Sequence, residues 1–373
     1  MVQLQRSTKF TGICFLIYIT YGIFVFFILP MLMPDPVTMQ RNQLNLQMQK
    51  FGNLSNYTLA TEGTPVRSLF VTFKGSGAIE FLDNLSSQPG CYHHFAPLIG
   101  NKRRIDKEEV ALKALNELVA LFNCDYSQSG RMLDVGSRAR IFRYFYGHQR
   151  SICMTYSRDI CWNRDTLTGV CKVYPFINMS VYNLGLKYLA MLLKREDLNI
   201  RIVFLVRDPR GTMYSRYNQV WCTGDPNCED PRFLCKDMVD EYKIAEELRQ
   251  KYPTRFRIIR FEELTTRPLQ NSMDLFKFYG LPIHIDAEEL EKEKKQTGSL
   301  RAMVATEDAS LNNNVNLPFQ WLDDLNPDQI KLVQNACSEA MRLWGYRQFE
   351  SWRNSTQAAA SFNPVVQPAP LSV

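Results

Sequence analysis

Several common sequence signatures are missing from this chain of 373 residues. No G-x-x-x-x-G-K-[ST] sequence occurs, which counts against an NTP-dependent kinase or an ordinary NTPase. The ten cysteines include no C-x-x-C pair, and Cys222, Cys228 and Cys235 are spaced too widely for a common zinc knuckle, so we expect no metal site. Basic and aromatic residues do not interleave in a patch, and the net charge of +6 is modest, so a nucleic-acid partner is not expected. There is also no internal repeat, and a chain of this length with 45% hydrophobic residues can build one large α/β core.

A long uncharged segment lies near the N-terminus. Phe10 to Met33 contains no charged residue and is long enough to cross the roughly 30 Å hydrocarbon core as a helix. A cleaved signal peptide is the alternative, but its apolar region normally has about 7 to 15 residues and ends at small residues. Arg6 and Lys9 precede the segment and Asp35 follows it, so the positive-inside rule places the N-terminus in the cytosol. We therefore expect a signal-anchor and a lumenal remainder.

Sequons and cysteines after this segment agree with a lumenal location. In an oxidising lumen the cysteines beyond Cys14 should form disulfides. Because their number is odd, at least one of these thiols is free or pairs between chains. The N-x-S/T sequons, which predict glycosylation, lie at Asn53, Asn56, Asn84, Asn178 and Asn354.

The stretch from Arg201 to Asn218 predicts a buried strand followed directly by a helix. Ile202 to Val206 is an apolar, β-branched run typical of a strand in a parallel sheet. Asp208 suits the N-cap of the next helix, and Pro209 suits its first position. Such junctions lie at the carboxyl end of a sheet, where α/β folds bind ligands.

The charges at this junction favour an anion. Arg207 and Arg210 flank the helix N-terminus, where free backbone N–H groups already attract negative charge. Gly211 and Ser215 are four residues apart and share a helix face, so a small residue clears the approach to a hydroxyl donor. The alternative is an ordinary strand-helix unit with a surface arginine pair.

A second strand-turn-helix pattern opens the globular part. Val66 to Phe73 reads as a strand, Lys74-Gly75-Ser76-Gly77 as a glycine-rich turn, and Ala78 to about Leu85 as a helix. Glycines let backbone N–H groups approach a phosphate, and Lys74 adds positive charge. Taken alone, a G-S-G turn is a weak signal.

These two patterns carry a resemblance to a known family. LVRDPRGTMYSR resembles the 3′-phosphate-binding motif of the Golgi carbohydrate sulfotransferases that modify the 6-hydroxyl of Gal, GalNAc or GlcNAc. The resemblance implies a P-loop-like α/β fold with a central parallel sheet flanked by helices, and 3′-phosphoadenylyl sulfate as co-substrate without a metal. It also implies that Arg207 and Ser215 hold the 3′-phosphate, while the turn from Lys74 to Gly77 cradles the 5′-phosphosulfate.

Two parts of the family pattern are altered. The family's 5′ loop resembles R-[ST]-G-S-S, but this chain has Phe73 at the basic position and Gly77 at the second serine, so Lys74 could take over the basic role by a shift of register. The family's F-E-P-L has Ala96 in place of its glutamate. His93 and His94 are candidate bases, and the alternative is a packed or solvated histidine pair.

Further along, R-F-E-E-L at residues 260–264 resembles the family's R-Y-E-D-L, with Glu262 and Glu263 read as helix-start carboxylates. Amphipathic or apolar patterns predict helices near residues 106–124, 181–193, 233–250 and 321–346. The expected layout is a cytosolic tail at 1–9, an anchor at 10–33, a polar stem at 34–65, a sulfotransferase-like domain at 66–350, and a disordered tail at 351–373.

Two functions follow from the resemblance. The first is sulfuryl transfer to a glycan or proteoglycan hydroxyl by a Golgi type II membrane protein, with a homodimer left open. The second is a catalytically silent relative that binds nucleotide or glycan, or scaffolds a partner enzyme, because the 5′ loop and the acceptor-side glutamate are altered.

Overall fold

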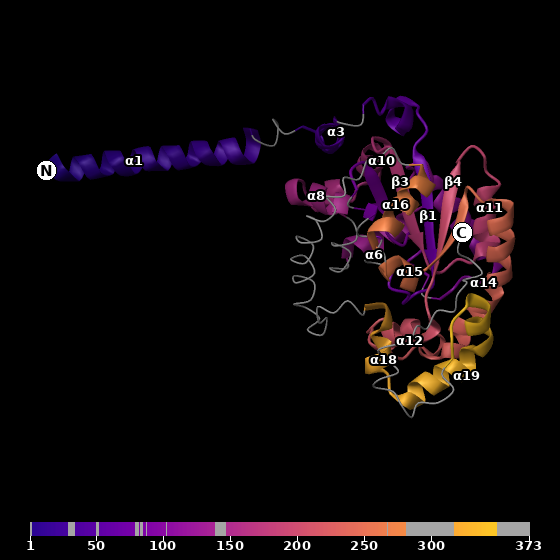
Figure 1. The fold of residues 1–373 in the computed structure, drawn as a ribbon. Coiled ribbons are helices and arrows are strands. Elements are labelled where there is room, and N and C mark those ends of the chain that lie inside the picture. Colours follow the sequence, from indigo (N-terminus) through magenta and orange to yellow (C-terminus); the bar gives the residue numbers. More distant parts are fainter. Residues whose placement is uncertain are drawn as a thin grey trace.

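The computed structural model describes residues 2–28, 34–49, 52–78, 82, 85–86, 88–101, 103–138, 147–266, 268–280 and 317–348 (Figure 1). Its centre is a sheet of five parallel strands in the order β2-β3-β1-β4-β5. The strands are β1 (Val66–Thr72), β2 (Cys91–His94), β3 (Phe176–Val181), β4 (Ile200–Val206) and β5 (Phe256–Arg260). This agrees with the α/β class and the parallel sheet expected from the sequence.

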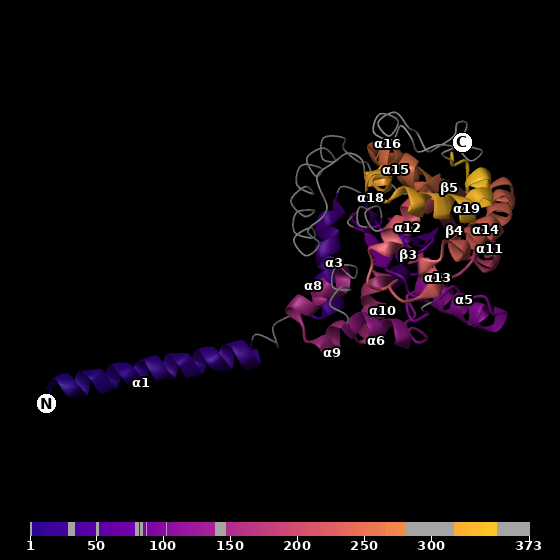
Figure 2. The same cartoon turned by 90° about the horizontal axis from the view of Figure 1, so that it is seen from below.

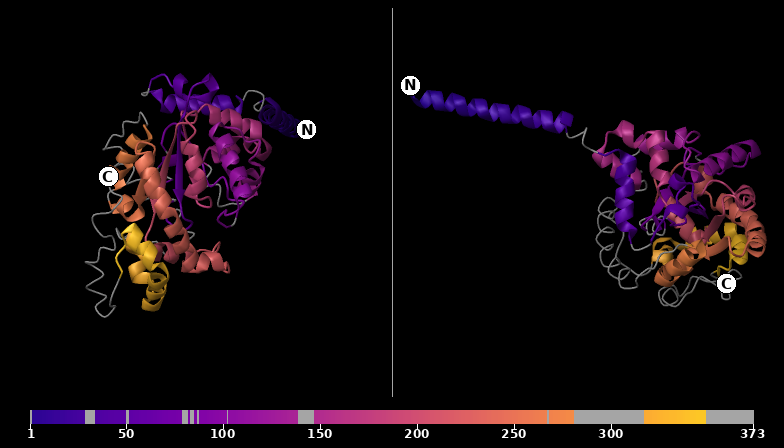
Figure 3. Two further views of the ribbon diagram at one scale, coloured as in Figure 1. Left: turned by 90° about the vertical axis from the view of Figure 1, so that its right-hand side faces the viewer. Right: turned by 90° about the horizontal axis from the view of Figure 1, so that it is seen from above.

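Helices cover both faces of the sheet, as the two views of Figure 3 show. The larger core packs one sheet face against α5 (Glu108–Phe122), α11 (Leu186–Leu193), α14 (Pro231–Lys251) and α19 (Pro327–Trp344). The smaller core packs the other face against α15 (Phe261–Thr266) and α16 (Pro268–Tyr279). Strands buried on both faces need apolar residues at nearly every position, which is why β4 is recognisable from its sequence.

The remaining helices lie around these layers. The helix α12 (Pro209–Tyr217) follows β4 directly and packs on α18 (Trp321–Asp324) and α19 at the carboxyl end of the sheet. The others are α6 (Gly130–Arg138), α8 (Gly147–Thr155), α9 (Arg158–Cys161), α10 (Arg164–Lys172), α13 (Pro226–Glu229), and the short helices η3 (Ser55–Tyr57), η4 (Leu59–Thr61) and η5 (Leu317–Phe319).

Two of the strands are not predicted by the sequence patterns. The segment that forms β2 stands out only as a family landmark, and the apolar residues at the end of β3 merge with the helix expected at 181–193. The helix α11 in fact begins at Leu186, after β3 has ended at Val181. Polar residues inside both strands, such as His93 and Asn178, hide their burial, because these side chains hydrogen-bond to one another within the sheet.

The predicted stem is partly wrong. The helix α3 (Pro36–Gln47) begins at an Asp35 N-cap and packs on the domain beside α8 and α10 (Figure 2). Leu44 is buried in the larger core, and Gln40 accepts a hydrogen bond from the hydroxyl of Tyr174 at 2.9 Å. Val37, Leu44 and Met48 face the larger core, whereas Leu46 is exposed, so the apolar pattern is weak and composition suggests a linker where the fold has a docked helix.

The N-terminal helix projects away from the body. It consists of α1 (Val2–Ile23) continued by a π-helical turn at Phe24–Ile28, and the large apolar side chains described along it are mostly exposed (Figure 1). Over the residues that the structure describes, no helix meets the length and apolarity that a membrane span requires. Residues 29–33 of the predicted anchor lie outside the described residues, as does the predicted tail at 351–373.

Eight cysteines form disulfides. The pairs are Cys124–Cys171, Cys153–Cys161, Cys222–Cys228 and Cys235–Cys337. Cys91 is buried and free, which confirms that the odd number leaves one thiol unpaired after the N-terminal segment. The last disulfide joins α14 to α19 and so connects the middle of the chain to its C-terminal helix.

Candidate functional site

The sheet order places two loops side by side. After β1 the chain crosses to β2 at one edge of the sheet, whereas β4 pairs with β1 on its other side. The loops that follow β1 and β4 therefore lie next to each other, where the strand order reverses. Open α/β sheets bind ligands at this point. The Thr72 hydroxyl donates a 3.0 Å hydrogen bond to the Leu205 carbonyl, which ties the two strand ends together.

The loop after β1 has the backbone shape of an anion cradle. Gly75 and Gly77 have φ values of +91° and +74°, a left-handed conformation that glycine adopts without strain. Between them, Ser76 is buried, and its hydroxyl has no hydrogen-bond partner in the described part of the chain. A buried hydroxyl of this kind is suited to an oxygen of a bound phosphate or sulfate.

Arg207 follows β4 and reaches the same loop. Its guanidinium lies 4.4 Å from the ring centroid of Phe261, and the side chain is buried. A Cβ on Gly77 would lie 3.1 Å from Arg207 Nη1, and a Cβ on Gly211 would lie 2.9 Å from its Nε. Both glycines therefore make room for Arg207 itself, a role for Gly211 that differs from the predicted one of clearing a ligand's approach.

Ser215 lies one turn after Gly211 on α12, as predicted, and is half-buried. The N-cap prediction is also confirmed, since the carboxylate of Asp208 accepts from the Arg210 N–H at 2.8 Å and Pro209 is the first helical residue. The local sequence thus sets the direction in which α12 leaves the sheet.

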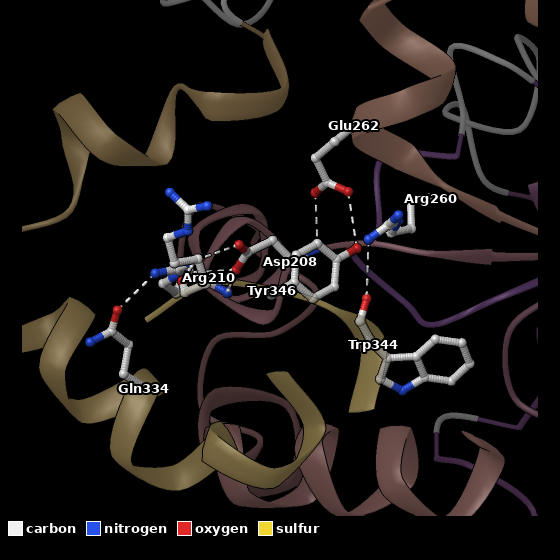
Figure 4. Close-up of polar contacts among 8 residues, drawn as sticks. Asp208, Arg210, Arg260, Glu262, Gln334, Trp344 and Tyr346 are labelled. Atoms are coloured by element: carbon white, nitrogen blue, oxygen red, sulfur yellow. Dashed lines mark hydrogen bonds and ion pairs between the residues drawn. The ribbon is translucent and has the colours of Figure 1, made fainter. Parts of the chain in front are cut away.

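Arg210 has a structural role, which corrects the expectation that both arginines serve an anion. Its guanidinium is completely buried and makes two hydrogen bonds to the Asp208 carboxylate, at 3.0 and 2.7 Å (Figure 4). It also donates to the Gln334 amide oxygen at 2.7 Å and to the Arg347 carbonyl at 2.9 Å. The indole of Trp321 covers it at 4.4 Å. These bonds hold α12 against α19.

Glu262 supports the same turn from the start of α15, directly after β5. Its carboxylate accepts from the Asp208 N–H at 2.9 Å and from the Tyr346 hydroxyl at 3.0 Å (Figure 4). Burial, reinforced by the nearby Asp208 carboxylate, raises the pKa of Glu262 to about 7. Beside it, Arg260 donates to the Trp344 carbonyl at 3.4 Å. The R-F-E-E-L segment therefore fastens the β4–α12 turn to the C-terminal helix.

Sequence reasoning missed Arg216. This buried arginine donates from Nε to the Lys74 carbonyl at 2.9 Å and from Nη1 to the Cys228 carbonyl at 3.4 Å. Burial lowers its pKa to about 10, so it stays charged at neutral pH. Arg216 is the last residue of the LVRDPRGTMYSR motif, directly after Ser215, and this position could have identified it as a site residue.

Lys74 is the first residue of the loop and is half-buried. Its ammonium is 4.0 Å from the ring centroid of Trp221, which directly precedes the disulfide-closed loop after α12. Burial, together with the charge of Arg216, lowers the pKa of Lys74. Lys74, Ser76 and Arg207 thus surround one small region at the carboxyl end of β1 and β4.

The two histidines proposed as bases lie elsewhere, which corrects that prediction. His93 and His94 are buried in β2, two strands away from β1, and pair in register with the middle of β3. The Nδ1 of His93 is 2.8 Å from the Asn178 amide, and the Nε2 of His94 is 2.9 Å from the Tyr126 hydroxyl. Burial lowers the pKa of each to about 3. Their burial, their hydrogen bonds and their low pKa favour the alternative interpretation, a packed histidine pair.

One predicted sequon is also wrong. Asn178 is fully buried in β3, and its side chain contacts Ser68 and His93, so the fold leaves no room for a glycan there. Asn53 and Asn56 are exposed, whereas Asn84 and Asn354 lie outside the described residues. Within the described ranges, no group of three or more His, Cys, Asp or Glu side chains could hold a metal ion.

Comparisons with known proteins find similarity to sulfotransferases. Residues 172–345 match the sulfotransferase domain family. Human carbohydrate sulfotransferase 6 is 30% identical over 213 residues, which cover 52% of this chain and 51% of that protein. Mouse carbohydrate sulfotransferase 4 is 25% identical over 271 residues, which cover 63% of this chain and 69% of that protein. The chain thus spans about half the length of the first of these relatives.

Among solved structures, mouse sulfotransferase SULT7A1 complexed with PAP aligns over 79% of this chain and 89% of that chain. Its sequence identity is 14% and its TM-score is 0.39, a similarity too low to establish a shared fold. The domain match and the two curated relatives show that this chain is similar to the carbohydrate sulfotransferases.

Proposed function

We propose that the chain transfers a sulfuryl group from 3′-phosphoadenylyl sulfate to a hydroxyl, the 6-OH, of a Gal, GalNAc or GlcNAc residue in a glycan or proteoglycan. The observation that carries this proposal is the meeting of two anion-binding features at the carboxyl end of the sheet. The loop of Lys74 to Gly77 and the β4–α12 turn with Arg207 are in contact there, and a nucleotide with phosphates at both its 3′ and 5′ positions needs two such features.

In this proposal each group has one task. Lys74, Ser76 and the N–H groups of the glycine turn bind the 5′-phosphosulfate, while Arg207 and Ser215 bind the 3′-phosphate. The acceptor oxygen attacks sulfur in line, the bond from sulfur to the 5′-phosphate oxygen breaks, and the acceptor proton passes to water. By analogy with phosphoryl transfer, positioning and charge stabilisation then supply most of the rate enhancement.

The proposed setting is the Golgi lumen, with residues 10–33 as the anchor of a type II membrane protein. Four disulfides support an oxidising compartment. The exposed apolar side chains along the projecting N-terminal helix support attachment to a membrane.

Replacing Arg207 tests the nucleotide assignment. Arg207→Ala should abolish retention of the purified full-length chain on immobilised 3′,5′-ADP, because a charge-assisted contact with the 3′-phosphate is lost. Arg342→Ala is a matched control, since that arginine is exposed on α19 in a surface ion pair with Glu339. Thermal unfolding of both variants checks that they are folded. Retention of Arg207→Ala equal to that of the control would refute the assignment.

A catalytically silent relative is the second candidate function. It is favoured by Ala96, which lies where the family pattern has glutamate and cannot transfer a proton. Incubating the chain with labelled donor and with keratan, chondroitin and mucin-type acceptors separates the candidates. Product formation supports the transferase, and retention on 3′,5′-ADP without product supports the silent binding protein.

A further inference from the structure

We propose that Trp221 is a platform on which a sugar ring of the acceptor glycan stacks, next to the point of sulfuryl transfer. This inference rests on the proposed function, because it needs Lys74 to lie beside the phosphosulfate. The observation behind it is the 4.0 Å distance between the Lys74 ammonium and the ring centroid of Trp221. The side chain of Trp221 is nevertheless 40% exposed. An indole ring, the largest of all side chains, is thus partly exposed to solvent beside Lys74.

The partial exposure of Trp221 beside the candidate site suggests that its ring contacts a ligand. Trp221 offers a broad apolar face and one N–H donor, a combination that suits partners with apolar faces and hydroxyl rims. A pyranose ring has such faces, lined by C–H groups carrying slight positive charge, and the π-face of an indole is negative. A sugar bearing the attacked hydroxyl must hold its oxygen about 3 to 3.5 Å from sulfur. Since the sulfuryl group would contact Lys74, such a sugar comes within reach of Trp221.

The loop that carries Trp221 is held in place at several points. The Cys222–Cys228 disulfide begins at the next residue and closes a short ring. Within this ring Asp225 caps α13 by accepting from the Asn227 N–H at 3.1 Å. Arg216 connects the Cys228 carbonyl to the Lys74 carbonyl, so the loop and the anion cradle share one buried side chain. A platform supported in this way presents its ring without losing much conformational entropy on binding.

The segment after β2 lies against the same loop. Arg103 approaches Asp225 at 3.9 Å, and the guanidinium of Arg104 lies 5.5 Å from the ring centroid of Phe73 at the end of β1. This segment follows the residues that resemble the acceptor-side landmark of the family. The Trp221 loop and this segment therefore approach each other beside Lys74, which is where an acceptor would enter.

The test separates glycan binding from donor binding. Isothermal titration measures binding of 3′,5′-ADP to the full-length chain, and then binding of Gal-, GalNAc- and GlcNAc-terminated oligosaccharides to the 3′,5′-ADP-loaded chain. Trp221→Ala should weaken the best oligosaccharide at least fivefold and change 3′,5′-ADP affinity less than twofold. Trp221→Phe keeps an aromatic face and should retain most of the glycan affinity. Tyr57→Ala is the matched control, because Tyr57 is 41% exposed but precedes β1, at the opposite end of the sheet.

Each outcome decides between specific alternatives. Equal glycan affinity in wild type and Trp221→Ala overturns the platform while leaving the proposed function intact. Loss of 3′,5′-ADP affinity in Trp221→Ala with glycan affinity unchanged also overturns it, because Trp221 then only positions Lys74. A wild-type chain that binds neither 3′,5′-ADP nor any of the oligosaccharides overturns the proposed function and the platform with it. Thermal unfolding of Trp221→Ala and Trp221→Phe shows whether a loss comes from misfolding.

Discussion

Among single residues, Glu262 joins three parts of the chain that are far apart in sequence. It accepts from the backbone at Asp208 and from the hydroxyl of Tyr346, and so couples α15, the β4–α12 turn and the C-terminal segment. Removing it by Glu262→Ala leaves two buried donors unsatisfied, at about 1 to 3 kcal/mol each. Glu262→Gln keeps both contacts, because its oxygen can accept from the Asp208 N–H and its amide can donate to the Tyr346 oxygen.

The same residue predicts a pH effect. Its pKa is about 7 in the folded protein, against 4.5 for an unperturbed glutamate, so the folded protein binds the extra proton between these values. The contribution of Glu262 to stability is therefore complete below pH 4.5 and is lost as pH rises toward 7. Relative to wild type, Glu262→Gln should gain about 2 kcal/mol of unfolding free energy between about pH 5 and pH 8. Urea unfolding with intact disulfides measures this difference, and a difference independent of pH would contradict it.

At the scale of elements, α3 is a docked part of the domain and not a spacer. Leu44 is 3% exposed and belongs to the larger core, while Leu46 on the same helix is 71% exposed. Leu44→Ala should lower the unfolding free energy by about 2 to 3 kcal/mol, through lost burial and a cavity. Leu46→Ala is the control and should change it by less than about 0.5 kcal/mol. If the two variants unfold at the same urea concentration, α3 is not part of the folded domain.

The C-terminal helix α19 is the second element with a positional role. It bonds Arg210 through Gln334, and its disulfide from Cys337 to Cys235 fixes it on α14. The β4–α12 turn is thereby supported by the last described part of the chain. The orientation of Arg207, which lies in this turn, depends on contacts made across more than a hundred residues of sequence.

For the whole molecule, the buried His93 and His94 and the half-buried His148 predict acid sensitivity. Burial lowers the pKa of His93 and His94 to about 3 and that of His148 to about 4, all below the ordinary histidine value of 6.5. The unfolded chain therefore binds up to three more protons than the folded one as pH falls below 6.5, and stability decreases. Glu262 and Glu117 oppose this with one proton each, because burial raises the pKa of both to about 7. The unfolding free energy should fall by on the order of 1 kcal/mol between about pH 6.5 and 5.5. Urea unfolding across this range measures the fall, and a flat profile would contradict it.

Local sequence patterns were sufficient to predict the local geometry of the candidate site. A β-branched run followed by Asp208 and Pro209 leaves few alternatives to a buried strand and an immediate helix, and paired glycines after an apolar run predict a tight turn. Each of these patterns consists of residues that are adjacent in sequence, so the local structure can be predicted from a single segment of the chain. The fold class followed from two such units and the apolar helices around them.

Which side chains face the site could be established only from the folded structure. Arg207 and Arg210 look equivalent in sequence. The guanidinium of Arg210, however, donates its hydrogen bonds to Asp208 and Gln334. Arg207 instead lies between Gly77 and Gly211, beside the anion cradle. His93 is buried among partners from β3, and Trp221 is brought to Lys74 by a disulfide loop. The physical reason is that burial and hydrogen-bond partners come from segments distant in sequence, so a residue's role depends on contacts that local patterns do not encode.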